Sequence, residues 1–276
     1  MLLRTASGCC LQLLLVWAIF ASFLEAAATV TATTAAAAAA AEPLEVDAQQ
    51  QMRPPLLIAL AGGSGCGKTV FANQVRKLAS EDSGDRLRIA VVEMDSYYRS
   101  LSEVDHLEAL KGNVNFDRIE AFDLELFSND IISMKHNDSW PMSLPQYDFK
   151  THQNVAGARV LEKPDAVIVE GLFVLAVPGL QEMFDLKVFV RDDADSCLVR
   201  RIRRDSEERG IDPLVGLLQY ELHVKKAYDD VIEPSSRHAD VTVPGVTQSF
   251  RAAELVSAWI SRKSATEDES SPPVCA

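Results

Sequence analysis

The sequence predicts an α/β fold in which a doubly wound, parallel sheet of five strands is covered by flanking helices. Three observations support this fold class: short continuous apolar runs recur along the chain, stretches with helical spacing separate them, and a glycine-rich loop follows the first run. Continuous apolar runs indicate strands that are covered on both faces. Alternation of such strands with helices favours a parallel sheet.

Five apolar segments are predicted to form the strands. They span residues 56–61, 87–93, 166–170, 186–190 and 240–243. Helical spacing of apolar residues lies between them, over residues 68–80, 194–208 and 214–232. Residues 140–165 contain Pro141, Pro145 and an extended run over residues 158–161, which favours a small inserted hairpin on the substrate side of the sheet.

The two ends of the chain differ in composition from its body. Arg4 precedes an apolar run over residues 9–24, and residues 26–41 are almost entirely Ala and Thr. This pattern resembles a signal peptide more than a full membrane span, and an early start codon or an organelle leader is the alternative. We therefore expect a leader and linker over residues 1–52, one domain over residues 53–262 and a disordered acidic, proline-containing tail over residues 263–276.

The net charge limits the possible binding partners, and the cysteine content limits the possible disulfide bonds. The net charge of −13 provides no broad basic surface for nucleic acid or for an anionic membrane. The body contains two cysteines, Cys66 and Cys197, which is no disulfide framework. Cys66 has no accompanying His or base motif, so we interpret it as a small residue tolerated in its loop.

The glycine-rich loop is the strongest motif. It follows the first strand and matches G-x-x-x-x-G-K-[ST], the P-loop or Walker A motif, in the strand-loop-helix context that the motif requires. We expect it to bind the phosphates of ATP, with Lys68 reaching the β and γ phosphates and Thr69 holding Mg²⁺. The loop residues are Gly62, Gly63, Ser64, Gly65, Cys66, Gly67, Lys68 and Thr69. The chain has no Asn-Lys pair, which argues against a guanine-specific switch.

Two carboxylates stand at the ends of strands predicted to lie next to the P-loop. Asp95 follows one strand and Glu170 ends another. Ligands of open α/β sheets bind outside the carboxyl ends of the strands, so both side chains can face the γ-phosphate. One can accept a proton from an acceptor hydroxyl while the other binds magnesium. The residues alone leave the assignment open, and an isolated Asp after a strand is more often a turn or a helix cap.

A basic cluster interrupts this acidic chain. On a helix it can close as a lid over the triphosphate and neutralise transition-state charge. The alternative is a solvated helix face paired with Glu207 and Glu208, which we expect to describe Arg203. The cluster consists of Arg200, Arg201, Arg203, Arg204 and Arg209.

With these residues in place, residues 56–245 resemble the uridine/cytidine kinase family. The segments that carry the resemblance, beyond the P-loop, span residues 95–98, 115–117, 121–123, 145–152, 170–171, 200–210, 219–220, 232–235 and 239–244. The resemblance implies a P-loop kinase that uses ATP and Mg²⁺ to phosphorylate the 5′-hydroxyl of uridine or cytidine in pyrimidine salvage. It implies a cytoplasmic enzyme and a homotetramer.

The resemblance also implies roles for single residues. Asp95 is expected to be the base, and Glu170 joins Thr69 as a metal ligand. Lys68, Arg201 and Arg204 are expected to act in catalysis, and Arg209 to bind ATP. The expected nucleoside pocket consists of Asp95, Tyr98, Phe116, Asp117, Tyr147, His152, Arg201 and Gln219.

Two positions depart from the family pattern. Ile211 stands where an arginine that helps to hold the nucleoside is usual, and Lys226 stands where a proline is usual. The alternatives are therefore a phosphoribulokinase-like or other small-metabolite kinase, and a non-catalytic nucleotide-binding regulator. The Tyr147–Phe149 segment with His152 argues against the first. A secreted or membrane-anchored interaction protein is a third alternative, which rests on residues 1–41 alone.

Overall fold

The computed structural model describes residues 53–84, 86–138, 140–157, 159–246 and 249–266. The described residues from Pro54 onward form one compact unit. The expected signal-like leader and most of the expected acidic tail lie outside the described residues. Among the helices that are described, none combines the length and apolar character that crossing a membrane requires.

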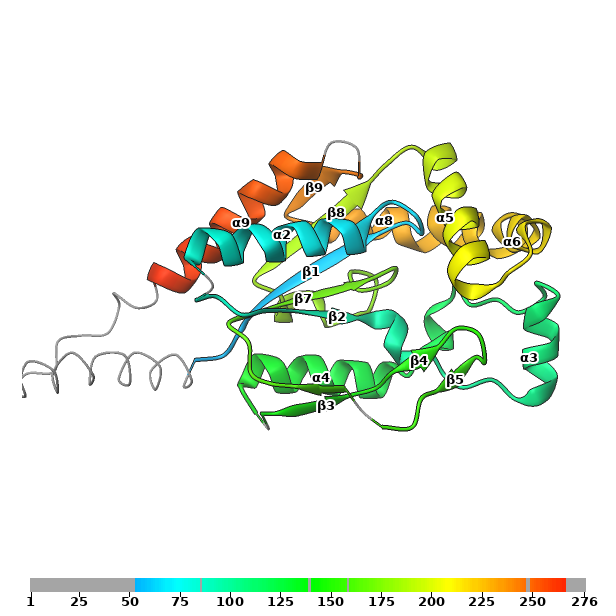
Figure 1. Cartoon of the computed structure of the whole chain (residues 1–276), viewed down its shortest axis with the longest axis horizontal. Coiled ribbons are helices and arrows are strands. Elements are labelled where there is room, and N and C mark those ends of the chain that lie inside the picture. Colours follow the sequence, from blue (N-terminus) through cyan, green and yellow to red (C-terminus); the bar gives the residue numbers. More distant parts are fainter. Residues whose placement is uncertain (1–52, 85, 139, 158, 247–248, 267–276) are drawn as a thin grey trace, which may run out of the picture. The chain divides into compact units, whose positions relative to one another are not determined.

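The core of the unit is a parallel five-stranded sheet, as the sequence predicts. Its strand order is β2-β7-β1-β8-β9, and every neighbouring pair is parallel (Figure 1). The order reverses beside β1, which places the loop after β1 at the crevice where ligands of such sheets bind. The strands are β1 Leu56–Gly62, β2 Ile89–Glu93, β7 Ala166–Gly171, β8 Leu186–Arg191 and β9 Val241–Pro244.

Two helices cover one face of the sheet. α2 (Lys68–Ser83) and α9 (Ser249–Thr266) lie side by side there (Figure 1). Their buried residues, such as Phe71 and Ile260, pack against Ile58 and its neighbours on that face. α9 continues four residues beyond residue 262, where we expected the domain to end.

The other face of the sheet is covered by α4 (Leu124–His136) and by the short 3-10 helix η1 (Met94–Tyr97). Leu57 and Ala59 point to this face because side chains alternate along β1. They belong to the same core as Phe127 on α4, which is fully buried. Both faces of the central strand β1 are therefore shielded from water, which explains its continuous apolar run.

The inserted segment forms two small antiparallel ladders between α4 and β7. β3 (Met142–Leu144) pairs with β6 (Arg159–Leu161), and β4 (Tyr147–Asp148) pairs with β5 (Gln153–Asn154). This confirms the expected hairpin within residues 140–165, although Ala158 at the start of its extended run is outside the described residues.

The region after β8 is helical, but less regular than expected. α5 (Ala194–Arg209) matches the predicted helix. The single helix expected over residues 214–232 is instead a succession of short segments with right-handed helical dihedrals, two of which are π-helical. These segments are α6 Pro213–Gln219, η4 Tyr220–Val224, α7 Lys225–Ala227, η5 Tyr228–Ile232, α8 Glu233–Ser235 and η6 Ser236–His238.

One further helix, α3, and two 3-10 turns complete the described elements. Neither α3 (Glu103–Leu110) nor α4 was predicted from the sequence, although both begin at a side-chain cap. Ser102 Oγ accepts from the Asp105 N–H, and Asp123 Oδ1 accepts from the Leu126 N–H. Such caps are helix-start signals that the sequence displays. The turns are η2 Ile119–Ala121 and η3 Gln181–Met183.

Candidate functional site

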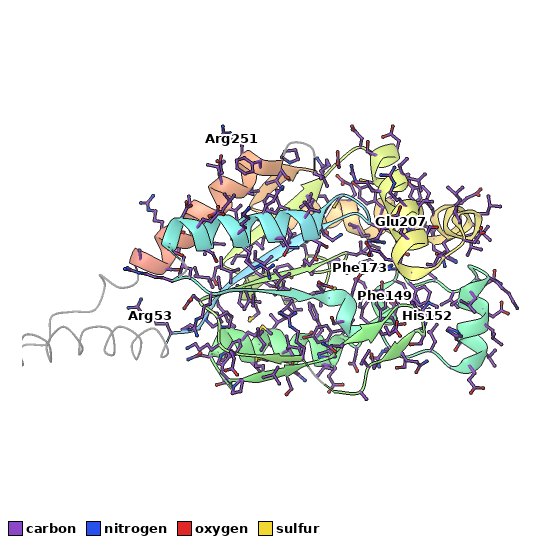
Figure 2. All side chains as sticks on the ribbon, in the orientation of Figure 1. Arg53, Phe149, His152, Phe173, Glu207 and Arg251 are labelled. Carbon is purple, nitrogen blue, oxygen red and sulfur yellow. The ribbon has the colours of Figure 1, made fainter. Side chains whose placement is uncertain are left out.

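A single large cavity opens at the carboxyl ends of β1, β2 and β7. It measures about 910 Å³ and is lined by the P-loop, η1, the β4–β5 hairpin, α5 and α6. This volume is at the upper end of those typical for small-molecule sites. Phe149 and His152 lie in the turn of the β4–β5 hairpin and line the cavity (Figure 2). The cavity thus joins the phosphate loop to the aromatic residues of the insert.

The P-loop has the backbone conformation that its glycines permit. Gly65 and Gly67 have φ angles of 77° and 98°, in the left-handed region that favours glycine. Gly67 is the residue that caps the start of α2, so the first N–H groups of that helix point toward the loop. Lys68 Nζ donates to the carbonyls of Gly62 and Gly63 at 3.1 and 3.0 Å, which holds the ammonium beside the loop.

Five of the eight expected loop residues line the cavity: Ser64, Gly65, Gly67, Lys68 and Thr69. The other three, Gly62, Gly63 and Cys66, do not. Cys66 faces the core instead, and burial raises the pKa of its thiol. A thiol held in its protonated form is a poor nucleophile, in keeping with the interpretation of Cys66 as a tolerated small residue.

Thr69 and Glu170 meet at the floor of the cavity. Thr69 Oγ1 donates to Glu170 Oε1 at 2.7 Å. Burial raises the pKa of Glu170, and the charge of Lys68 opposes that rise. A hydroxyl and a carboxylate are the hard oxygen ligands that Mg²⁺ prefers, so this pair fits the metal. Within the described ranges no group of three or more His, Cys, Asp or Glu side chains could hold a metal by itself, so a magnesium ion here would need substrate phosphates and water as its other ligands.

Asp95 stands across the cavity from this pair. It lies on η1, directly after β2, and lines the cavity together with Lys68 and Glu170. Its charge acts on its neighbours: burial and then Asp95 raise the pKa of Glu93. Glu93 also lines the cavity and was not identified from the sequence. The position of Glu93 at the end of β2 is the sequence signal that would have identified it.

The expected nucleoside residues converge on one end of the cavity. Tyr98 is central to an aromatic cluster, with ring centroids 6.0 Å from Phe116 and 5.4 Å from Tyr147. His152 stacks on Phe116 with centroids 5.1 Å apart. All of the expected pocket residues line the cavity, namely Asp95, Tyr98, Phe116, Asp117, Tyr147, His152, Arg201 and Gln219.

The arginines of α5 connect this end of the cavity with the P-loop. Arg201 Nη1 donates to Ser64 Oγ at 2.8 Å and lies 3.9 Å from Asp117 Oδ1. Arg200 Nε donates to the Gly65 carbonyl at 2.7 Å. Arg203 is exposed and does not line the cavity, which matches the solvated position expected for it.

Asp205 organises three of these arginines and received no role from the sequence. It is 1% exposed, and its Oδ1 accepts from Arg204 Nε and Nη2 at 2.9 and 2.8 Å. Its carboxylate also lies 3.4 Å from Arg201 Nε and 3.3 Å from Arg209 Nη1. Its spacing of four residues from both Arg201 and Arg209 on a predicted helix was the available signal.

Arg209 and Ile211 line the cavity at the end of α5. The Arg209 guanidinium lies 3.8 Å from the centroid of the Phe149 ring, a cation–π contact. Burial lowers the pKa of Arg209, and the nearby charge of Arg204 adds to that decrease. Ile211 lines the cavity beside it, so the departure from the family pattern lies within the site.

The fold and this cavity define a P-loop kinase. Comparison with known proteins agrees: residues 57–250 match the family described as Phosphoribulokinase / Uridine kinase family. The chain belongs to this family.

Individual relatives show how far the similarity extends. The chain is 34% identical over 220 residues to uridine-cytidine kinase B of Dictyostelium discoideum, covering 80% of this chain and 87% of the relative. It is 36% identical over 209 residues to the uridine kinase of Alkaliphilus metalliredigens, covering 76% of this chain and 96% of the relative. The solved phosphoribulokinase of Rhodobacter spheroides has the same fold, with a TM-score of 0.50 at 17% identity over 71% of this chain and 74% of that one.

Proposed function

We propose that this kinase transfers the γ-phosphoryl group of ATP to the 5′-hydroxyl of uridine, cytidine or both, giving UMP or CMP for pyrimidine salvage. One observation carries the proposal: a single cavity contains Lys68, Thr69 and Glu170 at one end and the aromatic and histidine cluster at the other, with Asp95 among them. Relatives that are named for uridine or cytidine cover most of the body of this chain.

Asp95 is the proposed general base. Phosphoryl transfer requires that the acceptor hydroxyl be aligned and that its proton be accepted as the new bond forms. Asp95 lines the cavity between the P-loop and the aromatic cluster, whereas Glu170 is already hydrogen-bonded to Thr69. We therefore assign the proton to Asp95 and metal binding to Thr69 and Glu170. When bound there, Mg²⁺ would neutralise charge on the phosphates.

The positive side chains stabilise the transferred group. Lys68 at the P-loop and Arg201 and Arg204 on α5 line the cavity, so all three can face the triphosphate. Charge-assisted hydrogen bonds from guanidinium groups stabilise the charge that spreads over the phosphoryl oxygens. Arg209, which also lines the cavity and stacks on Phe149, is proposed to contact ATP.

The nucleoside occupies the aromatic end. Phe116 and Tyr147 offer faces on which a base can stack. Asp117 is buried; burial raises its pKa, and Arg201 opposes that rise. The Asp117 carboxyl, 3.9 Å from Arg201 Nη1, can hydrogen-bond ribose hydroxyls. Gln219 on α6 and His152 complete the polar groups of this end.

A panel of acceptors tests the proposal. The full chain is incubated with ATP and Mg²⁺ together with uridine, cytidine, adenosine, ribulose 5-phosphate or buffer, and ADP release is measured. Uridine- or cytidine-dependent release, with the 5′-monophosphate identified as the product, supports the proposal and shows that Ile211 is tolerated in the site. Turnover of ribulose 5-phosphate without turnover of either nucleoside contradicts it while leaving the family unchanged.

A further inference from the structure

Two histidines from separate elements meet beside the cavity. His106 lies on α3 and His152 lies in the turn between β4 and β5, and their Nδ1 atoms are 2.9 Å apart. The His152 ring is fixed from the other side by its stacking on Phe116. Its backbone carbonyl accepts from the Leu101 N–H at 3.0 Å, which ties the turn to the segment before α3. The position of His152 is therefore determined on three sides.

The contact between the two Nδ1 atoms constrains the protons on both rings. One Nδ1 must donate and the other must accept, and a neutral imidazole carries its single proton on one nitrogen only. If His106 Nδ1–H donates, the proton of His152 is on Nε2. If His152 Nδ1–H donates, its Nε2 carries a lone pair. Because Nδ1 is engaged by His106, Nε2 is the ring nitrogen of His152 that remains for a ligand in the cavity that this residue lines.

Uracil and cytosine differ in the hydrogen bond that their exocyclic group can make with His152 Nε2. The exocyclic amine of cytosine is a donor, whereas the corresponding oxygen of uracil is an acceptor. A residue that served one base with a fixed tautomer would leave an unpaired polar group against the other, which costs affinity. A site that accepts both bases therefore benefits from a group whose donor and acceptor roles can exchange.

We propose that His106 is a specificity-determining residue that acts through His152, and that the pair changes tautomer so that one histidine contacts either uracil or cytosine. This inference rests on the proposed function. With uridine, His106 Nδ1–H donates and His152 Nε2–H contacts the oxygen of the base. With cytidine, the shared proton is on His152 Nδ1, and His152 Nε2 accepts from the amine.

The exchange conserves protons and leaves both rings neutral. The shared proton passes from His106 Nδ1 to His152 Nδ1. His152 then releases its Nε2 proton to water, and His106 takes up a proton from water at its own Nε2. His106 is half-buried, so its ring can exchange protons with water. Burial lowers the pKa of His152, and His106 adds to the decrease, which favours the neutral ring that this exchange needs.

The hydroxyl of Tyr147 can likewise change between donating and accepting a hydrogen bond. The hydroxyl of Tyr147 is buried and has no hydrogen-bond partner among the described residues. A phenol hydroxyl can either donate or accept a hydrogen bond. It can therefore face a ring nitrogen that is protonated in uracil and unprotonated in cytosine.

Nitrogen-15 NMR of the full chain tests the tautomers directly. The five histidines are labelled, and the His106 and His152 signals are assigned by their loss in H106K and H152Q. We expect the His152 Nε2 signal to be that of a protonated nitrogen with uridine bound and that of an unprotonated nitrogen with cytidine bound. Turnover of both nucleosides with the same His152 tautomer overturns the inference and leaves the proposed function standing. Binding and turnover of neither overturns both.

A substitution that can only donate provides the kinetic test. In H106K the ammonium donates to His152 Nδ1 and fixes the proton on Nε2, so kcat/KM for uridine stays within about threefold while that for cytidine falls about 10- to 100-fold, the loss of one buried hydrogen bond. The matched control is L107K, which adds the same charge at the neighbouring, exposed position of α3. An equal fall with both nucleosides shows a merely structural role for His106 and overturns the inference.

Discussion

At the residue scale, the proposed contact between His152 and the base predicts a pH dependence that differs between uridine and cytidine. Burial lowers the pKa of His152 below its ordinary value of about 6.5; His106 and Arg209 add to the decrease, and Asp148 opposes it. These groups come from α3, α5 and β4, the elements that surround the ring. The neutral ring therefore persists to lower pH than in a free histidine, and protonation converts it into a donor at both nitrogens.

We expect the ratio of kcat/KM for cytidine to that for uridine to fall as the pH is lowered from about 7.5 to about 5. The protonated ring still donates to uracil, but it has no lone pair for the amine of cytosine. Steady-state kinetics with both nucleosides at each pH make the measurement, and a ratio that stays constant or rises toward acid pH contradicts the account.

At the scale of elements, α5 owes its arrangement to one buried carboxylate. Asp205 is ion-paired with Arg201, Arg204 and Arg209, and its Oδ2 has no hydrogen bond of good geometry within the described residues. Three guanidinium groups at one carboxylate repel one another once that carboxylate is removed. Breaking a buried ion pair by removing one partner costs about 3 to 5 kcal/mol.

We therefore predict that Asp205→Ala lowers the free energy of unfolding by about 3 to 5 kcal/mol and raises the KM for ATP, because the arginines lose their positions. Denaturant titration measures the first effect and steady-state kinetics the second. Arg203→Ala, at an exposed position of the same helix, is the control and should change stability by less than about 0.5 kcal/mol. A stability loss for Asp205→Ala as small as that of the control would refute this role.

The P-loop and α5 approach each other so closely that only glycine fits at Gly65. Its φ is 77°, and a Cβ atom there would lie 2.2 Å from the carbonyl oxygen of Cys197. Gly84, at the end of α2, also has a left-handed φ of 62°, but a Cβ there meets nothing within 4 Å. An alanine would have a strained left-handed backbone at both positions, but its Cβ atom would clash with a neighbour only at position 65.

We predict that Gly65→Ala lowers kcat/KM for ATP by about 100-fold, the scale associated with a displacement of about 1 Å in a positioning group. Gly84→Ala should lose about 1 to 2 kcal/mol of stability and leave kcat/KM unchanged. Nucleotide titrations and kinetics on both variants make the comparison. Equal kinetic effects of the two substitutions would show that strain, rather than the contact with α5, is responsible.

At the scale of the whole molecule, the sheet was predictable because its central strands are buried on both faces. Leu56–Gly62 and Ala166–Gly171 are buried along their whole length, so their runs are continuously apolar. The P-loop was predictable because phosphate binding requires glycines, a lysine and a hydroxyl at fixed spacing. The inserted hairpin was confirmed because prolines mark its entry and the chain is extended within it.

Other features depend on distances in space that a linear pattern does not contain. His106 and His152 are 46 residues apart, and Arg201 and Ser64 are 137 residues apart, yet each pair is in contact. The π-helical segments of residues 220–232 have dihedrals close to those of an α-helix, so helical spacing predicts the direction of the chain and not its hydrogen-bond pattern. The roles of His106 and Asp205 arise from such contacts and required the structure.

The proposed base gives the most direct test of the central claim, that this chain is a nucleoside kinase with Asp95 at its reacting centre. Asp95→Asn keeps the size of the side chain and removes its capacity to accept the proton. The full chain carrying this substitution is compared with Asp230→Asn, an exposed carboxylate paired with Lys226 at 2.8 Å. We predict that Asp95→Asn lowers kcat for uridine or cytidine by about 10² to 10⁴, with ATP binding unchanged, and that Asp230→Asn has no effect. Near-normal turnover by Asp95→Asn would contradict the account.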